Sequence, residues 1–142
     1  MKIETFSNIE IAYMCNIGPY GIKNKELMEN FKEYLVKHDL FDEGTIIVGI
    51  ALDNHQIVSS EELRYYVGLI IDEDNCCELP KRKIDDGSYA IFEIEHTKEV
   101  IVDFFMNVEK LNLEIDFNRP IVERYAVTKI NRNLCEMCIP IK

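Results

Sequence analysis

Residues 120–127 read Pro-Ile-Val-Glu-Arg-Tyr-Ala-Val, which is typical of a β-strand with one carboxylate on an apolar face. Side chains alternate between the two faces of a strand. The residues that share one face are therefore Ile121, Glu123, Tyr125 and Val127. A carboxylate buried there needs a partner, either within the protein or from outside, such as a cationic, partly aromatic ligand. The alternative is a half-covered face on which Glu123 points into water.

The first half of the chain shows a pattern that predicts a strand, a helix and two further strands. Residues 9–16 form the predicted first strand, and Gly18-Pro19-Tyr20 leads from it into the helix. The apolar stripe of that helix consists of Leu27, Phe31, Tyr34 and Leu35. Apolar runs over residues 45–51 and 63–71 predict the other two strands.

The second half repeats this order after a turn at residues 83–87. Thr97, with Glu99 close behind, is the predicted N-terminal signal of the second helix. The apolar stripe of this helix consists of Val100, Ile101, Phe104, Phe105, Val108 and Leu111. The predicted strands of this half cover residues 88–95, 121–128 and 134–141.

The two β-α-β-β halves predict an α+β fold in a single domain over residues 1–142. The modules cover approximately residues 1–75 and 80–142. They can pair through their antiparallel sheets, with two helices on one face and a ligand cleft between the modules.

The composition is acidic, and the chain is long enough for a hydrophobic core. It has 142 residues, 47% of them hydrophobic, and a formal net charge of -10 from 26 Asp and Glu against 16 Lys and Arg. This charge argues against direct partners such as nucleic acid or anionic membranes. The N-terminus lacks the features of a secretory signal, and no apolar run approaches the ~20 residues of a membrane helix. We therefore expect a cytoplasmic protein.

The five cysteines are an odd number, which favours a reducing compartment in which they remain thiols. Cys135 and Cys138 have CxxC spacing, but residues three apart in the last predicted strand point to opposite faces and cannot hold one ion. Cys76 and Cys77 fall in a polar, loop-like stretch and are poorly placed to chelate a metal alone. We therefore expect no metal site and no cofactor.

Five short motifs follow one another along nearly the whole chain. They are Gly18-Pro19-Tyr20, Glu62-Leu63-Arg64-Tyr65, Gly87-Ser88-Tyr89 with Phe92, Pro120 to Tyr125, and Cys135 to Ile141. In this order they resemble the GyrI-like small-molecule-binding domain, which is related to the effector-binding domains of AraC-type and MerR-type transcription regulators. The resemblance implies two β-α-β-β modules around a pseudo-two-fold axis.

The resemblance also implies a pocket for hydrophobic, often planar and cationic compounds, built from a central glutamate and aromatic rings. The residues at the matching positions are Glu123, Tyr125, Tyr65, Tyr20, His96 and Ile101. An aromatic face attracts a cation by ~0.5–2 kcal/mol, and a low dielectric strengthens its attraction to a carboxylate. One departure is Tyr66, because many members carry an acidic residue there, which argues against a carboxylate role at that position.

Three of these residues also have a structural interpretation. Tyr20 can fix the entry to the first helix, and Tyr65 can be a core residue whose hydroxyl is bonded to the backbone. A lone histidine at a strand end, such as His96, is usually a cap or a surface residue.

Three functions are compatible with this resemblance. The leading hypothesis is a stand-alone binding module that captures amphipathic, cationic molecules and sequesters them or signals to a separate regulator, because no DNA-binding segment is expected in this chain. The second is hydrolysis of cyclopropane-containing alkylating compounds, with Glu123 as general base and Tyr20 or Tyr65 as hydrogen-bond donor. The third is a gyrase-inhibitor-like interaction protein, which the scattered acidic residues disfavour.

Overall fold

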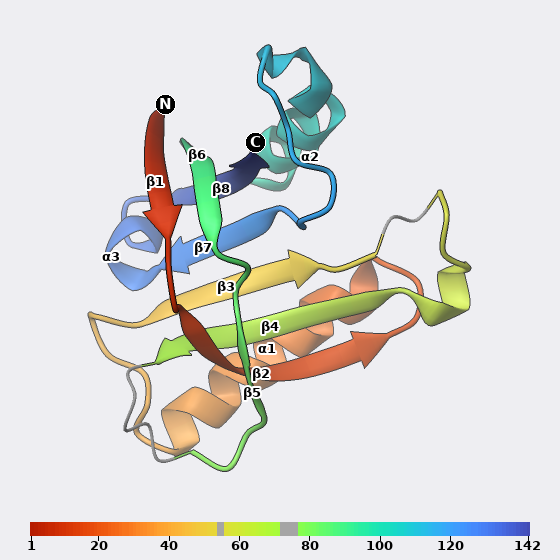
Figure 1. The fold of residues 1–142 in the computed structure, drawn as a ribbon. Coiled ribbons are helices and arrows are strands. Elements are labelled where there is room, and N and C mark those ends of the chain that lie inside the picture. The colour runs from red at the N-terminus through yellow and green to blue at the C-terminus, as the bar shows by residue number, and fades with distance from the viewer. Residues whose placement is uncertain (54–55, 72–76) are drawn as a thin grey trace.

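Eight strands of the described residues form one curled antiparallel sheet (Figure 1). The structure is a computed structural model that describes residues 1–53, 56–71 and 77–142. The strands are β1 (Lys2–Phe6), β2 (Glu10–Ile17), β3 (Ile46–Ala51), β4 (Arg64–Ile71), β5 (Lys81–Lys83), β6 (Gly87–Glu95), β7 (Val122–Ala126) and β8 (Leu134–Ile141). Their order across the sheet is β1-β6-β8-β7-β3-β4-β2-β5.

Two helices pack on the sheet. The helix α1 (Ile22–Lys37) lies against β2 and β4, and α2 (Lys98–Met106) lies against β6. The shorter helical segments are α3 (Val127–Ile130) and the 3₁₀ turns η1 (Ser60–Glu62) and η2 (Val108–Leu111). The predicted stripe of α1 is confirmed, since Phe31 and Leu35 are fully buried.

The strands β3 and β7 join the two halves of the chain at the centre of the sheet. Their register pairs Ile47 with Tyr125 and Gly49 with Glu123. The elements follow the order β2-α1-β3-β4 in the first half and β6-α2-β7-β8 in the second. The mixed α+β class and the antiparallel sheet are therefore confirmed.

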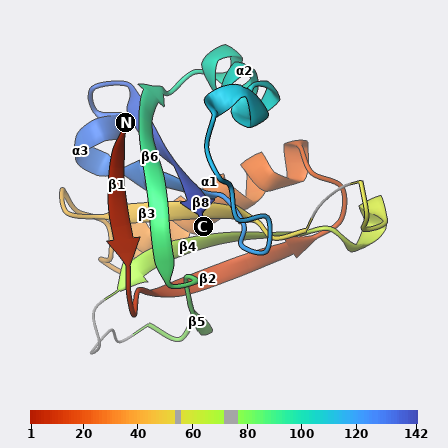
Figure 2. The same cartoon turned by 45° about the horizontal axis from the view of Figure 1, so that its top comes forward.

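The sheet has a hydrophobic core on each face. On the helix side, one cluster forms beneath α1 and another beneath α2. The sheet curls, so that β1 and β6 cross in front of β3 and β4 in the view of Figure 2. The rings of Phe6 and Tyr89 stack inside this curl with centroids 4.1 Å apart. The inner face is thus buried without a helix to cover it.

Two strands at the sheet edges, β1 and β5, were not predicted. β1 pairs with β6, and β5 pairs with β2 over three residues. The sequence of β5 is Lys-Arg-Lys, which carries no apolar alternation. This strand is held at the edge by its backbone pairing with β2 rather than by apolar side chains. Arg82 of this strand lies over the ring of Tyr66, 4.5 Å from its centroid.

Two predicted elements end earlier than expected. The strand predicted over residues 121–128 stops at Ala126, where α3 makes the short connection to β8. The second helix stops at Met106, because the Asn107 side chain donates a hydrogen bond to the carbonyl oxygen of Asp103 and a 3₁₀ turn follows. The N-terminal signal is confirmed, since Thr97 Oγ1 accepts a hydrogen bond from the backbone N–H of Val100.

Within the described residues, no helix combines the length and apolar character needed to cross a bilayer.

Candidate ligand-binding pocket

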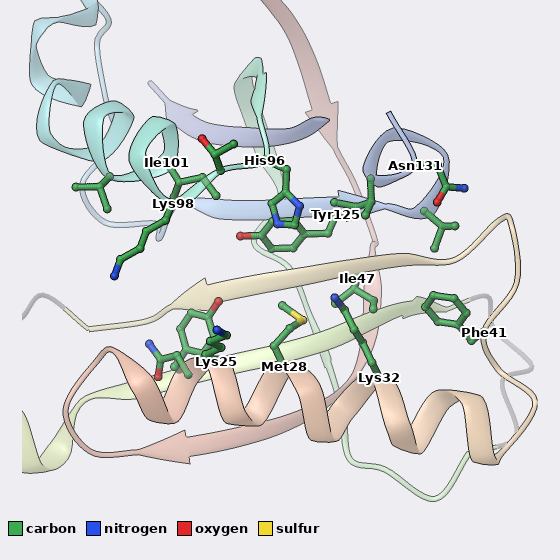
Figure 3. Close-up of a pocket in the computed structure, with 16 residues that line it drawn as sticks. Lys25, Met28, Lys32, Phe41, Ile47, His96, Lys98, Ile101, Tyr125 and Asn131 are labelled. Carbon is green, nitrogen blue, oxygen red and sulfur yellow. The ribbon is translucent and has the colours of Figure 1, made fainter. Parts of the chain in front are cut away.

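A pocket of about 510 Å³ lies between α1 and α2, over the junction of β3 and β7 (Figure 3). Its apolar and aromatic lining consists of Met28, Phe41, Ile47, Tyr65, Ile101, Val102, Tyr125, Val127 and Ile130. Its polar lining consists of Asn24, Lys25, Lys32, His96, Thr97, Lys98 and Asn131. This volume and mixture are typical of sites for drug-sized molecules.

Glu123 lies behind two tyrosines of the pocket wall and finds its hydrogen-bond partners inside the protein. The hydroxyl of Tyr125 donates to Oε1 of Glu123 at 2.5 Å, and the hydroxyl of Tyr65 donates to the same oxygen at 3.1 Å. The predicted alternation is confirmed, because the next residue, Arg124, binds Glu4 and Glu136 on the opposite face.

Burial changes the acidity of all three groups. Loss of solvent raises the pKa of Glu123, and the two tyrosine hydrogen bonds offset part of that rise. Burial and the nearby negative charge of Glu123 raise the pKa of Tyr65 and Tyr125 far above the usual tyrosine range. The hydroxyls therefore stay protonated, and a positive charge in the pocket would favour the ionised form of Glu123.

Gly49 is a site residue that the sequence analysis missed. It lies opposite Glu123 in the sheet, and a Cβ atom there would clash with the Tyr65 hydroxyl and lie 3.1 Å from Oε1 of Glu123. The absence of a side chain thus gives the hydroxyl and the carboxylate room to meet. A glycine within an otherwise β-branched strand was the available signal, because it often marks such a close approach.

Two further predicted residues, His96 and Ile101, line the pocket from its α2 side. The His96 ring lies against the Tyr125 ring with centroids 5.5 Å apart. Burial, and secondarily the positive charge of Lys32, lower the pKa of His96. The imidazole is therefore favoured in its neutral form and offers hydrogen bonds rather than charge.

Tyr20 lies outside the pocket lining. Its hydroxyl is within hydrogen-bond distance of the carbonyl oxygens of Asp53 (3.0 Å) and Arg64 (2.9 Å) and accepts a hydrogen bond from the Asp53 N–H. Its ring stands edge-on to that of Tyr65 at 6.3 Å between centroids. Tyr20 thus packs against the Tyr65 ring without itself lining the pocket.

The face that α1 turns toward the pocket was also missed. Lys25, Met28 and Lys32 project from α1, and Lys98 extends from the first turn of α2 (Figure 3). The spacing of i, i+3 and i+7 along α1 was the available signal, because it places the three residues on one face beside the apolar stripe. The Oδ1 atom of Asn24 is buried there without a hydrogen-bond partner among the described residues.

The CxxC pair does not form a joint site. Cys135 belongs to the core beneath α2, and Cys138 belongs to the core inside the curl, on the opposite face. Burial raises the pKa of Cys135 to about 11 and that of Cys138 to about 12, so both remain thiols. Among the residues that the structure describes, no three His, Cys, Asp or Glu side chains cluster as metal ligands. Cys76 lies outside the described residues.

Comparison with known proteins assigns the chain to a family. Residues 1–142 match the model of the GyrI-like small molecule binding domain. The chain belongs to the GyrI-like family. This GyrI-like chain is 40% identical over 149 residues to the "SPbeta prophage-derived putative transcriptional regulator YosT" of Bacillus subtilis (strain 168), with 100% of this chain and 99% of YosT covered.

Two solved structures share the GyrI-like fold of this chain. SAV2435, determined bound to tetraphenylphosphonium, has a TM-score of 0.62 at 10% identity and covers 99% of this chain and 93% of its own. The "Putative bacterial transcription regulation protein" from Staphylococcus aureus MU50 has a TM-score of 0.63 at 9% identity, and the match covers 99% of this chain and 97% of that one. At these identities the similarity shows the fold.

Proposed function

We propose that this chain binds hydrophobic, often cationic or planar small molecules in the pocket between α1 and α2. The observation that carries the proposal is Glu123, a half-buried carboxylate held by two tyrosine hydroxyls behind the wall of a largely apolar pocket. A binding protein makes use of such a costly arrangement when the ligand supplies the missing positive charge.

The apolar lining suits a flat hydrophobic body. Met28 faces the rings of His96 and Tyr125, which are tilted against each other, across the pocket (Figure 3). Aromatic faces favour planar ligands, and the flexible methionine side chain adapts to different shapes. We therefore expect a broad range of ligands that share size and aromatic surface rather than one chemical skeleton.

The tyrosine hydroxyls can relay the negative charge of Glu123 to the pocket. Each hydroxyl donates its proton to Oε1 of Glu123, so the lone pairs of its own oxygen remain available to a ligand. A hydrogen bond to a carboxylate polarises the donor oxygen and makes it a better acceptor. A cationic or hydrogen-bond-donating ligand would gain most from this arrangement.

The comparisons support this class of ligand. SAV2435, which shares the fold, was determined with tetraphenylphosphonium, a hydrophobic cation. The relative YosT carries the name of a transcriptional regulator. We therefore propose that ligand capture by this chain sequesters the compound or signals its presence to a separate regulatory partner.

The test compares two probes of similar shape, cationic tetraphenylphosphonium and neutral triphenylphosphine oxide, by isothermal titration calorimetry. We expect micromolar-class affinity for the cation, and a loss of roughly tenfold or more in Glu123→Gln. The neutral probe should change far less. The control is Glu109→Gln, which removes an exposed carboxylate on η2, outside the pocket lining. An equal loss for both probes in Glu123→Gln would contradict the electrostatic role.

A second candidate function is hydrolysis with Glu123 as general base. The observation that favours it is the raised pKa of Glu123 beside two hydroxyl donors, an arrangement found at acid–base sites. Incubation with a cyclopropane-containing alkylating compound would then give a ring-opened product. The product should disappear in Glu123→Gln while the compound still binds, and unchanged substrate in the wild type would remove this candidate.

A further inference from the structure

Three lysines surround the pocket, and the proposed function leaves them unused. Lys25 and Lys32 come from α1, and Lys98 comes from the first turn of α2, on the other side of the opening (Figure 3). All three side chains belong to exposed residues. None of the described residues that line the pocket is acidic, although the chain has 26 acidic residues against 16 Lys and Arg. The pocket lining thus carries three lysines and no carboxylate, although the protein as a whole is acidic.

These lysines are not taken up by ion pairs with the described residues. No carboxylate oxygen of those residues lies within 4.0 Å of the ammonium group of Lys25, Lys32 or Lys98. On the same helix, Lys23 pairs with Glu26 at 3.4 Å, and neither residue lines the pocket. The face of α1 toward the pocket therefore presents ammonium groups that can receive a ligand.

The positive charge also reaches the pocket interior. Burial is the main cause of the lowered pKa of His96, whose ring lies against Tyr125, and the Lys32 ammonium adds to it. A field that disfavours a proton on His96 favours negative charge at the same position. Glu123 is separated from this region by the two tyrosines of the wall. The pocket thus has a negative group behind its wall and positive groups around its opening.

We propose that the opening of the pocket is an anion subsite, and that the preferred ligands carry a carboxylate, sulfonate or phosphate group on a planar hydrophobic body. The body lies against Tyr65 and Tyr125, and the acidic group lies among Lys25, Lys32 and Lys98. This inference rests on the proposed function, because it assigns a ligand class to the same pocket. A cationic body with an acidic substituent satisfies both ends of the site.

The test uses two dyes with the same cationic ring system, rhodamine B, which has a free carboxylate, and its ethyl ester, which lacks it. Binding is followed by fluorescence anisotropy at low ionic strength. We expect rhodamine B to bind roughly three- to tenfold more tightly than the ester, since each exposed charge contact contributes a small factor. The preference should shrink as salt is added, because the lysines are solvent-exposed.

The triple variant Lys25→Gln/Lys32→Gln/Lys98→Gln should bring the two affinities to within a factor of about two of each other. The charge-matched control removes three exposed lysines outside the pocket lining, Lys83, Lys110 and Lys142, and should keep the preference. Single lysine variants, each checked by circular dichroism, should show partial losses if the triple variant does not fold.

The outcomes separate the two proposals. If the ester binds to the wild type as tightly as rhodamine B, the anion subsite is overturned while ligand binding in the pocket stands. A control variant that loses the preference as completely as the pocket variant also overturns the subsite, since the general field would then explain it. If neither dye binds, the proposed function fails and the subsite fails with it.

Discussion

At the scale of the residue, the proposed function rests on Glu123. Its Oε1 atom accepts hydrogen bonds from Tyr125 and Tyr65, and burial raises its pKa. A carboxyl group of this kind gains a proton more readily than a surface glutamate. A cation bound nearby would reverse that preference, so ligand binding and proton release should be linked.

We predict that the protein releases a proton when it binds tetraphenylphosphonium. The bound cation lowers the pKa of Glu123, so the group loses its proton at any pH between its free and bound pKa. The affinity should rise as the pH rises through the pKa of the free protein. Calorimetry in buffers of different ionisation enthalpy measures the proton count.

The control for this experiment is Glu123→Gln, which cannot release the proton. His96 also lies in the pocket, so any release that persists in the variant belongs to that or another group. Equal proton release in the wild type and in Glu123→Gln would contradict the linkage to Glu123.

We predict that Gly49→Ala lowers the free energy of unfolding by about 1–3 kcal/mol, because the new methyl group overpacks the contact between Tyr65 and Glu123. It should also weaken tetraphenylphosphonium binding. The matched control is Gly44→Ala, whose Cβ would meet Asp42 at an ordinary 3.4 Å and should leave stability nearly unchanged. Urea unfolding measures the stability of both variants. Equal losses of stability in Gly49→Ala and Gly44→Ala would argue against the steric role of Gly49.

The residues of one strand face could be predicted, but the opposing surfaces could not. Alternation alone placed Glu123 and Tyr125 on the same strand face, because the period of a strand is a local property. The roles of Gly49 and Lys32 depend on which strand and which helix lie opposite, and no local pattern encodes that. Tyr20 shows the same limit, because its position in the chain suggests the pocket whereas its hydroxyl bonds the backbone.

At the scale of the element, α2 depends on its first turn. It has nine residues, and Thr97 Oγ1 accepts a hydrogen bond from the Val100 N–H at its start. We predict that Thr97→Ala lowers the free energy of unfolding by about 1 kcal/mol, whereas Thr97→Ser, which keeps the acceptor, loses much less. Urea unfolding measures the difference. An alanine variant as stable as the serine variant would argue against the cap.

A second element, β1, is tied to the sheet by a charged contact. The guanidinium of Arg124 donates hydrogen bonds to both oxygens of Glu4 at 2.9 and 3.1 Å and lowers the pKa of Glu4 from 4.5 to about 2. A carboxylate whose pKa is lowered on folding stabilises the folded protein at pH values above the pKa that the group has in the unfolded chain. That contribution disappears as the pH falls from about 4.5 through about 2.

We therefore predict that Glu4→Gln lowers the free energy of unfolding by about 1–3 kcal/mol at pH 7, with a difference from the wild type that vanishes toward pH 2. The exposed control Glu109→Gln should show no such pH dependence. Thermal unfolding followed by circular dichroism across this pH range tests it. A constant difference at every pH would contradict the role of the Glu4 charge.

The ends of elements were less predictable than their cores. Thr97 was correctly identified as a cap because its partner is only three residues away. The end of α2 at Met106 depends on the Asn107 side chain, which competes for backbone partners despite the continuing apolar stripe. The edge strand β5 has a fully charged sequence, so no hydrophobic pattern could reveal it.

At the scale of the whole molecule, the pocket exists because two halves of the chain meet at β3 and β7. The register of these strands brings Gly49 opposite Glu123, and α1 and α2 then enclose the space above the junction. The repeated order of elements was visible in the sequence, because each half carries its own periodicity. The curl of the sheet, with β1 crossing to β6, depends on long-range pairing and was not predictable from either half alone.

The most direct test of the central claim is a crystal structure of the protein with tetraphenylphosphonium. We predict that the cation lies between α1 and α2, with its phenyl rings against Tyr65 and Tyr125 and its charge on the side of Glu123. A cation bound elsewhere, with the space between the helices filled by water, would contradict the account.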